Sequence, residues 1–317
     1  MIIILTERAF ERSKALSFLK GLNRRNSVYS PMITSLCLVM LLALPDSLLT
    51  VVIDSDADPF RHAVSVARAA DGTFIVADHG ENSVSVWNGR NERIRSIGGT
   101  GWGSDAFQNV TDVTASFLLD IYVTDANNRR VLRFDRRFDP VQELNEGSIG
   151  PLDGSFQPVA CATASTGKLY ILESDERRIL ELDARGKVTG TLCASGSRGP
   201  VLTEPKDIAV DDEDRIVVLD GATVQIIDRF GNGIGSIALD PAHRWTSVAC
   251  GPDHILAVAP DRIEMIGRTD ARRMTITPAM VLGMETDDPF ADVAESAGSL
   301  NILTAHRLLR CRMPSVR

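Results

Sequence analysis

The chain has 317 residues with 34 Lys and Arg against 42 Asp and Glu, a net charge of -8, and 44% of its residues are hydrophobic. This length and apolar content suit one large or two ordinary folded domains. They exclude a disordered, a collagen-like or a disulfide-dense chain. Residues 1–31 carry six basic and two acidic side chains, so residues 32–317 have a net charge of -12. An acidic body repels phosphate backbones, which argues against nucleic acid as a partner.

An uncharged apolar run of 13 residues, Met32 to Leu44, follows the basic leader 1–31. As a helix it would span about 20 Å, short of the ~30 Å hydrocarbon core of a membrane. That length suits the apolar part of a secretory signal, with Arg24 and Arg25 on its cytoplasmic side. We therefore predict that residues 32–47 are a signal or membrane-anchor segment. The alternative is a buried N-terminal helix.

Export to the periplasm or the extracellular space follows from this prediction. The sequence near Pro45 lacks a small-x-small cleavage pattern, so cleavage stays an open question. If the segment is not cleaved, residues 32–44 hold the protein at the inner membrane and are its sole contact with the bilayer.

Short apolar runs separated by Gly, Asp and Asn recur from residue 60 to the end of the chain, and six copies of one pattern align. In the second copy 13 residues separate Asp112 from Asp125, and the same interval joins Asp207 to Asp220. The copies repeat every 39 to 49 residues, and four short strands in ~45 residues are typical of a propeller blade. The six aligned positions, which we assign to one point of the inner strands, are Ser65, Asp112, Cys161, Asp207, Thr246 and Asp292.

Ring closure gives an independent indication of the same fold. The sixth copy has no clear fourth strand, whereas residues 49–53 form a strand-like run that belongs to no copy. A propeller must hide its exposed strand edges, so strand 49–53 should complete the sixth blade. The sequence thus predicts an all-β, six-bladed propeller over residues 48–317.

The second copy resembles the NHL repeat in Gly98-Gly-Thr-Gly101, in Phe107-Gln-Asn-Val-Thr-Asp112 and in the run from Ile121 to Asp135. Copies one, three and four match as well, whereas copies five and six have Ala259 and Ala305 in place of the second Asp. The resemblance covers about residues 50–313 and implies a propeller of NHL-like repeats. The family includes scaffolds, ligand binders and a few enzymes, so the resemblance leaves the function open.

Three aligned positions, Asp112, Asp207 and Asp292, are carboxylates on alternate blades two, four and six. Converging near the channel axis, they could hold Ca²⁺ or another divalent cation, which takes oxygen ligands. The alternative, which we favour, is that each Asp binds backbone N–H groups nearby. The acids that close the second strands, Asp78, Asp125 and Asp220, are interpreted as scaffolding of the repeat.

No complete phosphate loop, nucleophile elbow or zinc-binding histidine set occurs in the sequence. The cysteines downstream of the signal are expected to be buried free thiols: Cys161, Cys193, Cys250 and Cys311. The sequence therefore favours a non-catalytic scaffold that binds a protein or a small ligand on one face and needs no cofactor. The alternative is a divalent-metal-dependent hydrolase or lactonase that uses Asp112, Asp207 and Asp292.

Overall fold

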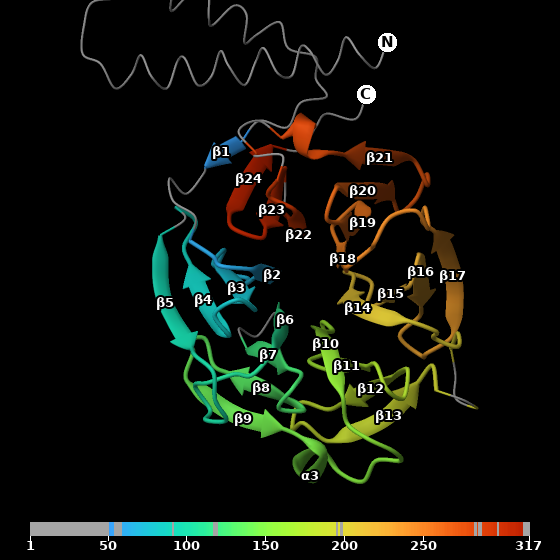
Figure 1. The fold of residues 1–317 in the computed structure, drawn as a ribbon. Coiled ribbons are helices and arrows are strands. Elements are labelled where there is room, and N and C mark those ends of the chain that lie inside the picture. The colour runs from blue at the N-terminus through green and yellow to red at the C-terminus, as the bar shows by residue number, and fades with distance from the viewer. Residues whose placement is uncertain are drawn as a thin grey trace, which may run out of the picture.

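The structure is a computed structural model that describes residues 51–53, 59–90, 92–116, 120–194, 196, 199–281, 284, 287–296 and 298–312. These residues form six four-stranded antiparallel sheets around a central axis (Figure 1). The predicted all-β, six-bladed propeller is confirmed.

We number the blades along the chain and give the strands of each blade from the channel outward. Blade 1 contains β2 (Ala63–Arg68), β3 (Phe74–Asp78), β4 (Ser83–Trp87) and β5 (Arg93–Gly98). Blade 2 contains β6 (Val110–Ala115), β7 (Ile121–Asp125), β8 (Arg130–Phe134) and β9 (Pro140–Leu144). Blade 3 contains β10 (Pro158–Thr163), β11 (Leu169–Glu173), β12 (Arg178–Leu182) and β13 (Val188–Leu192). Blade 4 contains β14 (Pro205–Val210), β15 (Ile216–Asp220), β16 (Thr223–Ile227) and β17 (Gly233–Ala238). Blade 5 contains β18 (Ser247–Cys250), β19 (His254–Ala259), β20 (Arg262–Gly267) and β21 (Arg273–Ile276). Blade 6 contains β22 (Phe290–Ser296), β23 (Ser299–Thr304), β24 (Leu308–Arg312) and β1 (Val51–Ile53). Two short helices lie in loops between blades, α3 (Glu146–Ile149) and the 3₁₀ helix η1 (Pro278–Met280).

Burial follows the position of a strand within its blade. Every residue of β3, β7, β11 and β15 is buried, because neighbouring blades cover both faces of these second strands. They accordingly appear in the sequence as continuous apolar runs. The outermost strands β5 and β17 are largely exposed. The hydrophobic core is therefore divided into layers between adjacent blades.

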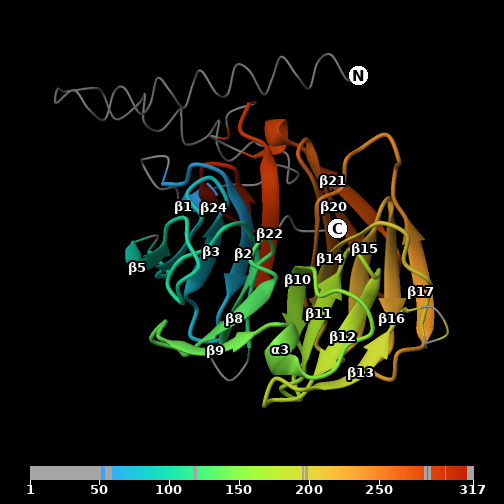
Figure 2. The same cartoon turned by 60° about the horizontal axis from the view of Figure 1, so that its bottom comes forward.

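The two ends of the ring meet in blade 6. Strand β1 pairs with β24, with Val51 opposite Cys311, so the first strand of the chain completes the last sheet (Figure 1). Blade 6 then packs against blade 1 through one apolar cluster in which Leu303 and Leu308 join Phe60 and Trp87. Figure 2 shows β1, β24 and β22 beside the strands of blade 1. The ring is closed by strand pairing and by this cluster.

The predicted signal or anchor segment at 32–47 lies outside the described residues. Within the described part of the chain, no helix is long and apolar enough to cross a membrane. Cys161, Cys193 and Cys311 are buried there and Cys250 is partly buried, and all four thiols are free.

Candidate functional site

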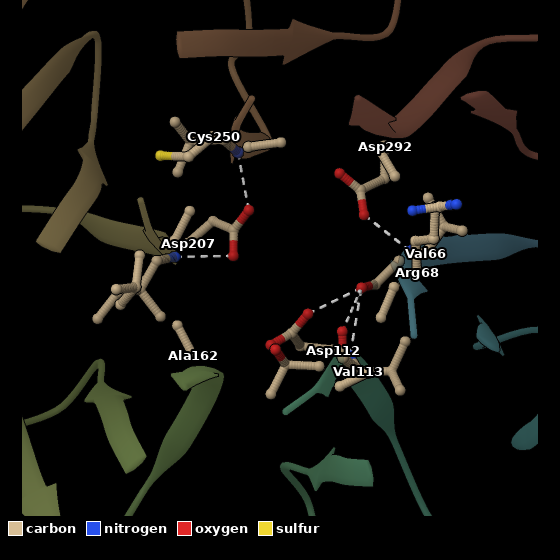
Figure 3. A pocket seen from close by; sticks show the side chains of 18 of the residues that line it. Val66, Arg68, Asp112, Val113, Ala162, Asp207, Cys250 and Asp292 are labelled. Atoms are coloured by element: carbon tan, nitrogen blue, oxygen red, sulfur yellow. Dashed lines mark hydrogen bonds between the residues drawn. The ribbon is translucent and has the colours of Figure 1, made fainter. Parts of the chain in front are cut away.

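The inner strands of all six blades enclose a central cavity of about 250 Å³. Asp112 on β6, Asp207 on β14 and Asp292 on β22 lie around it, as Figure 3 shows. Asp112 and Asp292 are buried, and Asp207 is partly exposed to the channel. The structure thus brings together the three carboxylates that the sequence repeat placed on alternate blades.

Strand register identifies the residue that corresponds to these carboxylates in the other blades. Asp112 lies opposite Thr124, one residue before the acid that ends β7. The same register places Ser65, Ala160 and Ser247 at this point in blades 1, 3 and 5. Around the ring the position therefore alternates between a small residue and Asp.

The sequence alignment was wrong by one residue in two blades, where it assigned Cys161 and Thr246 to this position. In blade 3 the second strand ends at Glu173, one residue earlier than the alignment assumed. In blade 5 a shorter hairpin sets Ser247 opposite Val258. An alignment based on a fixed interval of 13 residues could not detect that the hairpin is shorter.

Each carboxylate at this position connects neighbouring blades. Oδ1 of Asp112 accepts a hydrogen bond from the hydroxyl of Ser65 in blade 1 (2.8 Å). Oδ2 of Asp112 accepts one from the backbone N–H of Cys161 in blade 3 (2.8 Å). One side chain of blade 2 therefore binds the inner strands of blades 1 and 3.

Asp292 repeats this arrangement at the closure of the ring. It accepts a hydrogen bond from the hydroxyl of Ser247 in blade 5 and from the backbone N–H of Val66 in blade 1 (2.7 Å). Asp207 accepts from the N–H of Val248 in blade 5 (2.7 Å). We call the six residues at this position the inter-blade belt: Ser65, Asp112, Ala160, Asp207, Ser247 and Asp292.

One donor is missing from the belt. Ser65 and Ser247 each donate to the Asp of the following blade. Ala160 of blade 3 has no hydroxyl to offer Asp207, which is left with backbone donors, Val248 and its own neighbour Ile208. The junction between blades 3 and 4 is therefore the one at which the belt makes no side-chain hydrogen bond among the described residues.

Burial raises the pKa of all three belt carboxylates, because the charged form loses its hydration. The pKa of Asp207 is raised well above its usual range, first by burial and then by the charges of Asp112 and Asp292. Burial raises the pKa of Asp292 to about 7, against the hydrogen bonds from Ser247 and Val66. Burial thus favours the neutral form of each of the three acids.

A cation at Asp112, Asp207 and Asp292 would have to bind carboxylate oxygens that already accept hydrogen bonds. Every oxygen of the three carboxylates already accepts an N–H or O–H donor. Among the residues that the structure describes, no group of three or more His, Cys, Asp and Glu side chains is arranged to hold a metal ion. The geometry favours the structural interpretation of the three acids, and the metal site stays a prediction.

A second group of buried acids ends the second strands. Asp78 accepts hydrogen bonds from the N–H groups of Arg61 and His62, and Asp125 from those of Gln108 and Asn109. Asp220 does the same for the segment before β14. These acids hold the segment that leads into the inner strand of their own blade. They are part of the repeat scaffold, as predicted, although their partners lie far away in sequence.

A buried arginine holds the loop between β5 and β6. Nε of Arg130, the first residue of β8, donates to Oδ2 of Asp125 at 3.0 Å. Its other guanidinium nitrogens donate, each at 2.9 Å, to the carbonyl oxygens of Trp102, Gly103 and Ala106. The amide of Asn128 donates to the carbonyl of Gly101 in the same loop (2.9 Å). The loop backbone is therefore fixed by side chains of blade 2.

The side chain that this fixed loop presents is Trp102, which is 69% exposed. Blade 3 uses the same device: Arg178 pairs with buried Glu173 and donates to the carbonyl of Ser155, and the Phe that follows, Phe156, is buried like its counterpart Phe107 in blade 2. An exposed indole on a rigid loop thus distinguishes blade 2. Sequence analysis missed it, although an Arg five residues after the strand-ending acid in both blades is a usable signal.

No protein-family profile and no curated protein sequence matches the chain. Solved structures match in fold. A streptogramin B lyase is 12% identical and covers 82% of this chain and 96% of its own, with a TM-score of 0.60. A catalytically inactive virginiamycin B lyase from Staphylococcus aureus with quinupristin is 14% identical, covering 79% and 80% of the two chains, with a TM-score of 0.57. A chain of a mitotic checkpoint complex is 12% identical, covering 83% and 92%, also with a TM-score of 0.57. Likeness at these identities shows the shared fold alone.

Restoring the missing donor should stabilise the ring. In Ala160→Ser the new hydroxyl should donate to Asp207, as Ser65 donates to Asp112, and raise the free energy of unfolding by about 1–2 kcal/mol. Ala164→Ser, at a buried alanine beyond the end of β10, should instead lower it, because no belt carboxylate serves that position. Denaturant unfolding of both variants would measure the difference, and equal effects would contradict this role of Ala160.

The raised pKa of Asp292 predicts a pH dependence of stability. Because the folded pKa of about 7 exceeds the value of 3.8 usual for Asp, the folded chain binds more protons between these pH values. The contribution of Asp292 to the free energy of unfolding should therefore fall as the pH rises from about 4 to 7, by about 1.4 kcal/mol per pH unit. Unfolding titrations should show a flatter slope for Asp292→Asn and an unchanged one for Asp71→Asn, an exposed carboxyl. A slope that Asp292→Asn leaves unaltered would refute the assignment.

Proposed function

We propose that this protein is an exported, non-catalytic binding scaffold of NHL-like repeats that holds a protein or other ligand on the face carrying the loops between blades. The observation that carries the proposal is the fixed loop of blade 2. Four backbone carbonyls of this loop are bound by Arg130 and Asn128, yet its largest side chain, Trp102, is left in solvent.

The exposure of Trp102 has no role in the core of the propeller. Tryptophan is among the residues that contribute most to binding interfaces, through its large contact area. A loop that is already rigid loses little conformational entropy when it binds. The bonds to Arg130 and Asn128 therefore prepare Trp102 for contact with a partner.

The channel supports the non-catalytic part of the proposal. Its three carboxylates are occupied with hydrogen bonds between blades, and no histidine is among the described residues that line the cavity. In the alternative, a metal-dependent hydrolase, Asp112, Asp207 and Asp292 would hold a divalent ion that polarises a carbonyl. That role would compete with the hydrogen bonds that join the blades.

Two of the similar structures illustrate what the fold can serve. One is a lyase with the small ligand quinupristin, and another is a chain of a mitotic checkpoint complex. A propeller is thus compatible with either class of partner, and the choice depends on the side chains of its surface. The acidic body of this chain argues against nucleic acid, and export follows from the sequence of residues 32–44.

Replacing Trp102 should remove binding and spare the fold. In this experiment the full chain is immobilised and exposed to an extract of its own organism. The Trp102→Ala variant should capture the partner at least about tenfold less well than the parent. Phe230→Ala, which removes an aromatic ring that is 57% exposed on the outer hairpin of blade 4, should capture it normally. Both variants should keep the melting temperature of the parent. Equal capture by the parent and Trp102→Ala would contradict the proposal.

Metal content distinguishes the proposal from the hydrolase alternative. The full chain, purified without chelator or affinity tag, should carry no stoichiometric divalent ion by elemental analysis. One ion per chain that is lost in Asp207→Asn would overturn the scaffold proposal, and would justify assays with ester and lactone substrates.

A further inference from the structure

A groove lies on the outer part of blade 1, beside the fixed loop that carries Trp102. It has a volume of about 710 Å³, within the range of small-molecule sites. Its lining comes from the turn between β3 and β4, the end of β5 and the loop that follows: Arg61, Gly80–Ser83, Ser96–Thr100 and Asp105.

The walls of the groove are held in place by backbone contacts. The N–H of Gly99 donates to the carbonyl of Asn82 (2.9 Å), and the N–H of Phe107 donates to the carbonyl of Gly99 (2.9 Å). Gly98 has a φ of 137°, and a Cβ there would lie 2.4 Å from Cα of Ser83, so the two segments can pack this closely because residue 98 is glycine. At Gly99 a Cβ would meet nothing within 4 Å, so this residue borders open space.

The lining is polar and largely unpaired. Arg61, Glu81 and Asp105 are exposed side chains that form no ion pair among the described residues. The amide nitrogen of Asn82 donates to the hydroxyl of Thr100 (3.3 Å), whereas its Oδ1 is shielded from solvent and has no hydrogen-bond partner.

This combination of groups restricts the chemistry of a ligand. An apolar ligand would leave the charged lining without partners. Glu81 and Asp105 disfavour an anion, and Arg61 disfavours a simple cation. A ligand with several hydroxyl groups fits, because a hydroxyl can donate to a carboxylate and also accept from a guanidinium.

Trp102 supplies the remaining feature. It lies on the same fixed loop as Thr100 and Asp105, which line the groove. An exposed indole offers a flat apolar face, and on the loop that supplies polar residues to the groove it suits a molecule with one apolar and one polar side. A sugar ring is such a molecule, with C–H bonds on its faces and hydroxyl groups on its rim.

We propose that the blade 1 groove and Trp102 form a binding site for a neutral saccharide, either a free oligosaccharide or the glycan of a larger polymer. This inference rests on the proposed function, since it identifies the class of ligand for the same face of the propeller. The carboxylates of Glu81 and Asp105 accept hydrogen bonds from the hydroxyl groups of the sugar, and Arg61 donates to those hydroxyl groups. Trp102 covers one face of the sugar ring.

Trp102 also provides the measurement. Trp87 and Trp245 are buried, so quenching of tryptophan fluorescence by acrylamide in the full chain reports mainly on Trp102. Hexamers of glucose and of N-acetylglucosamine with different linkages serve as probes, with sulfated heparin hexamers and a lysine-rich peptide as charged controls. We expect at least one neutral probe to protect Trp102 from quenching and the charged controls to leave it accessible.

Variants test the contribution of the groove. Glu81→Gln and Asp105→Asn should each weaken binding of the protecting probe about tenfold or more, because each loses a charged acceptor. Asp175→Asn, in the corresponding turn of blade 3, should bind like the parent. Co-sedimentation with the insoluble polymer of the same sugar distinguishes a polymer glycan from a free oligosaccharide, since only a polymer site should bind both forms with similar affinity per sugar residue.

The failure of this inference is separable from that of the scaffold proposal. If no neutral saccharide protects Trp102, or if protection is unchanged in Glu81→Gln and Asp105→Asn, the saccharide site is refuted. Capture of a partner that depends on Trp102 would then leave the scaffold proposal standing. Loss of both saccharide protection and Trp102-dependent capture would overturn the two together.

Discussion

Six blades form a closed ring only when each inner strand is attached to its neighbours, and the belt carboxylates contribute to that attachment near the axis. Asp112, Asp207 and Asp292 each accept the N–H of a residue in the following blade. Three side chains on alternate blades thus bind the inner strands of the three blades between them, and two of them also bind the serine of the blade before.

The same arrangement has an electrostatic cost. Burial disfavours the charged forms of all three carboxylates, and repulsion adds to this at Asp207 and Asp292, so the pKa values of all three are raised. Small residues on the intervening blades limit this cost, because Ser65 and Ser247 donate where a further Asp would add charge. Ala160 is the exception, and Asp207 beside it is the acid whose pKa is raised well above the usual range.

Much of the fold could be predicted from the sequence, because each blade repeats one short pattern of apolar runs. The strand assigned to ring closure within residues 49–53 is present as β1, which pairs with the last strand of blade 6. The belt Asp residues of blades 2 and 4 were also found, because they keep their interval to the acid that follows, and Asp292 was found although its second strand ends at Thr304. The interval failed in blade 5, where the hairpin is shorter, and in blade 3, where Glu173 takes the place of Asp.

The loop of blade 2 and the groove could not be predicted in this way, because their contacts join residues that no local pattern connects. Arg130 binds carbonyl groups 24 to 28 residues earlier in the chain, and Asn82 meets Thr100 across a hairpin. The sequence does allow the copies of the repeat to be compared with one another. Arg130 and Arg178 occupy the same place in two blades and hold the same kind of loop. Both loops bury a Phe, Phe107 and Phe156, but the loop of blade 2 also carries the exposed Trp102.

That comparison indicates where function lies in a repeat protein. Residues shared by the copies, such as the strand-ending acids and the arginines that pair with them, are already committed to holding the ring together. A side chain that one copy has and the others lack is not required by the scaffold, and its exposure must be explained by something outside the fold. In this chain the carboxylates of the acidic channel hold the blades to one another, whereas at the rim of blades 1 and 2 a rigid loop carries an exposed indole near charged side chains that form no ion pair within the described part of the chain.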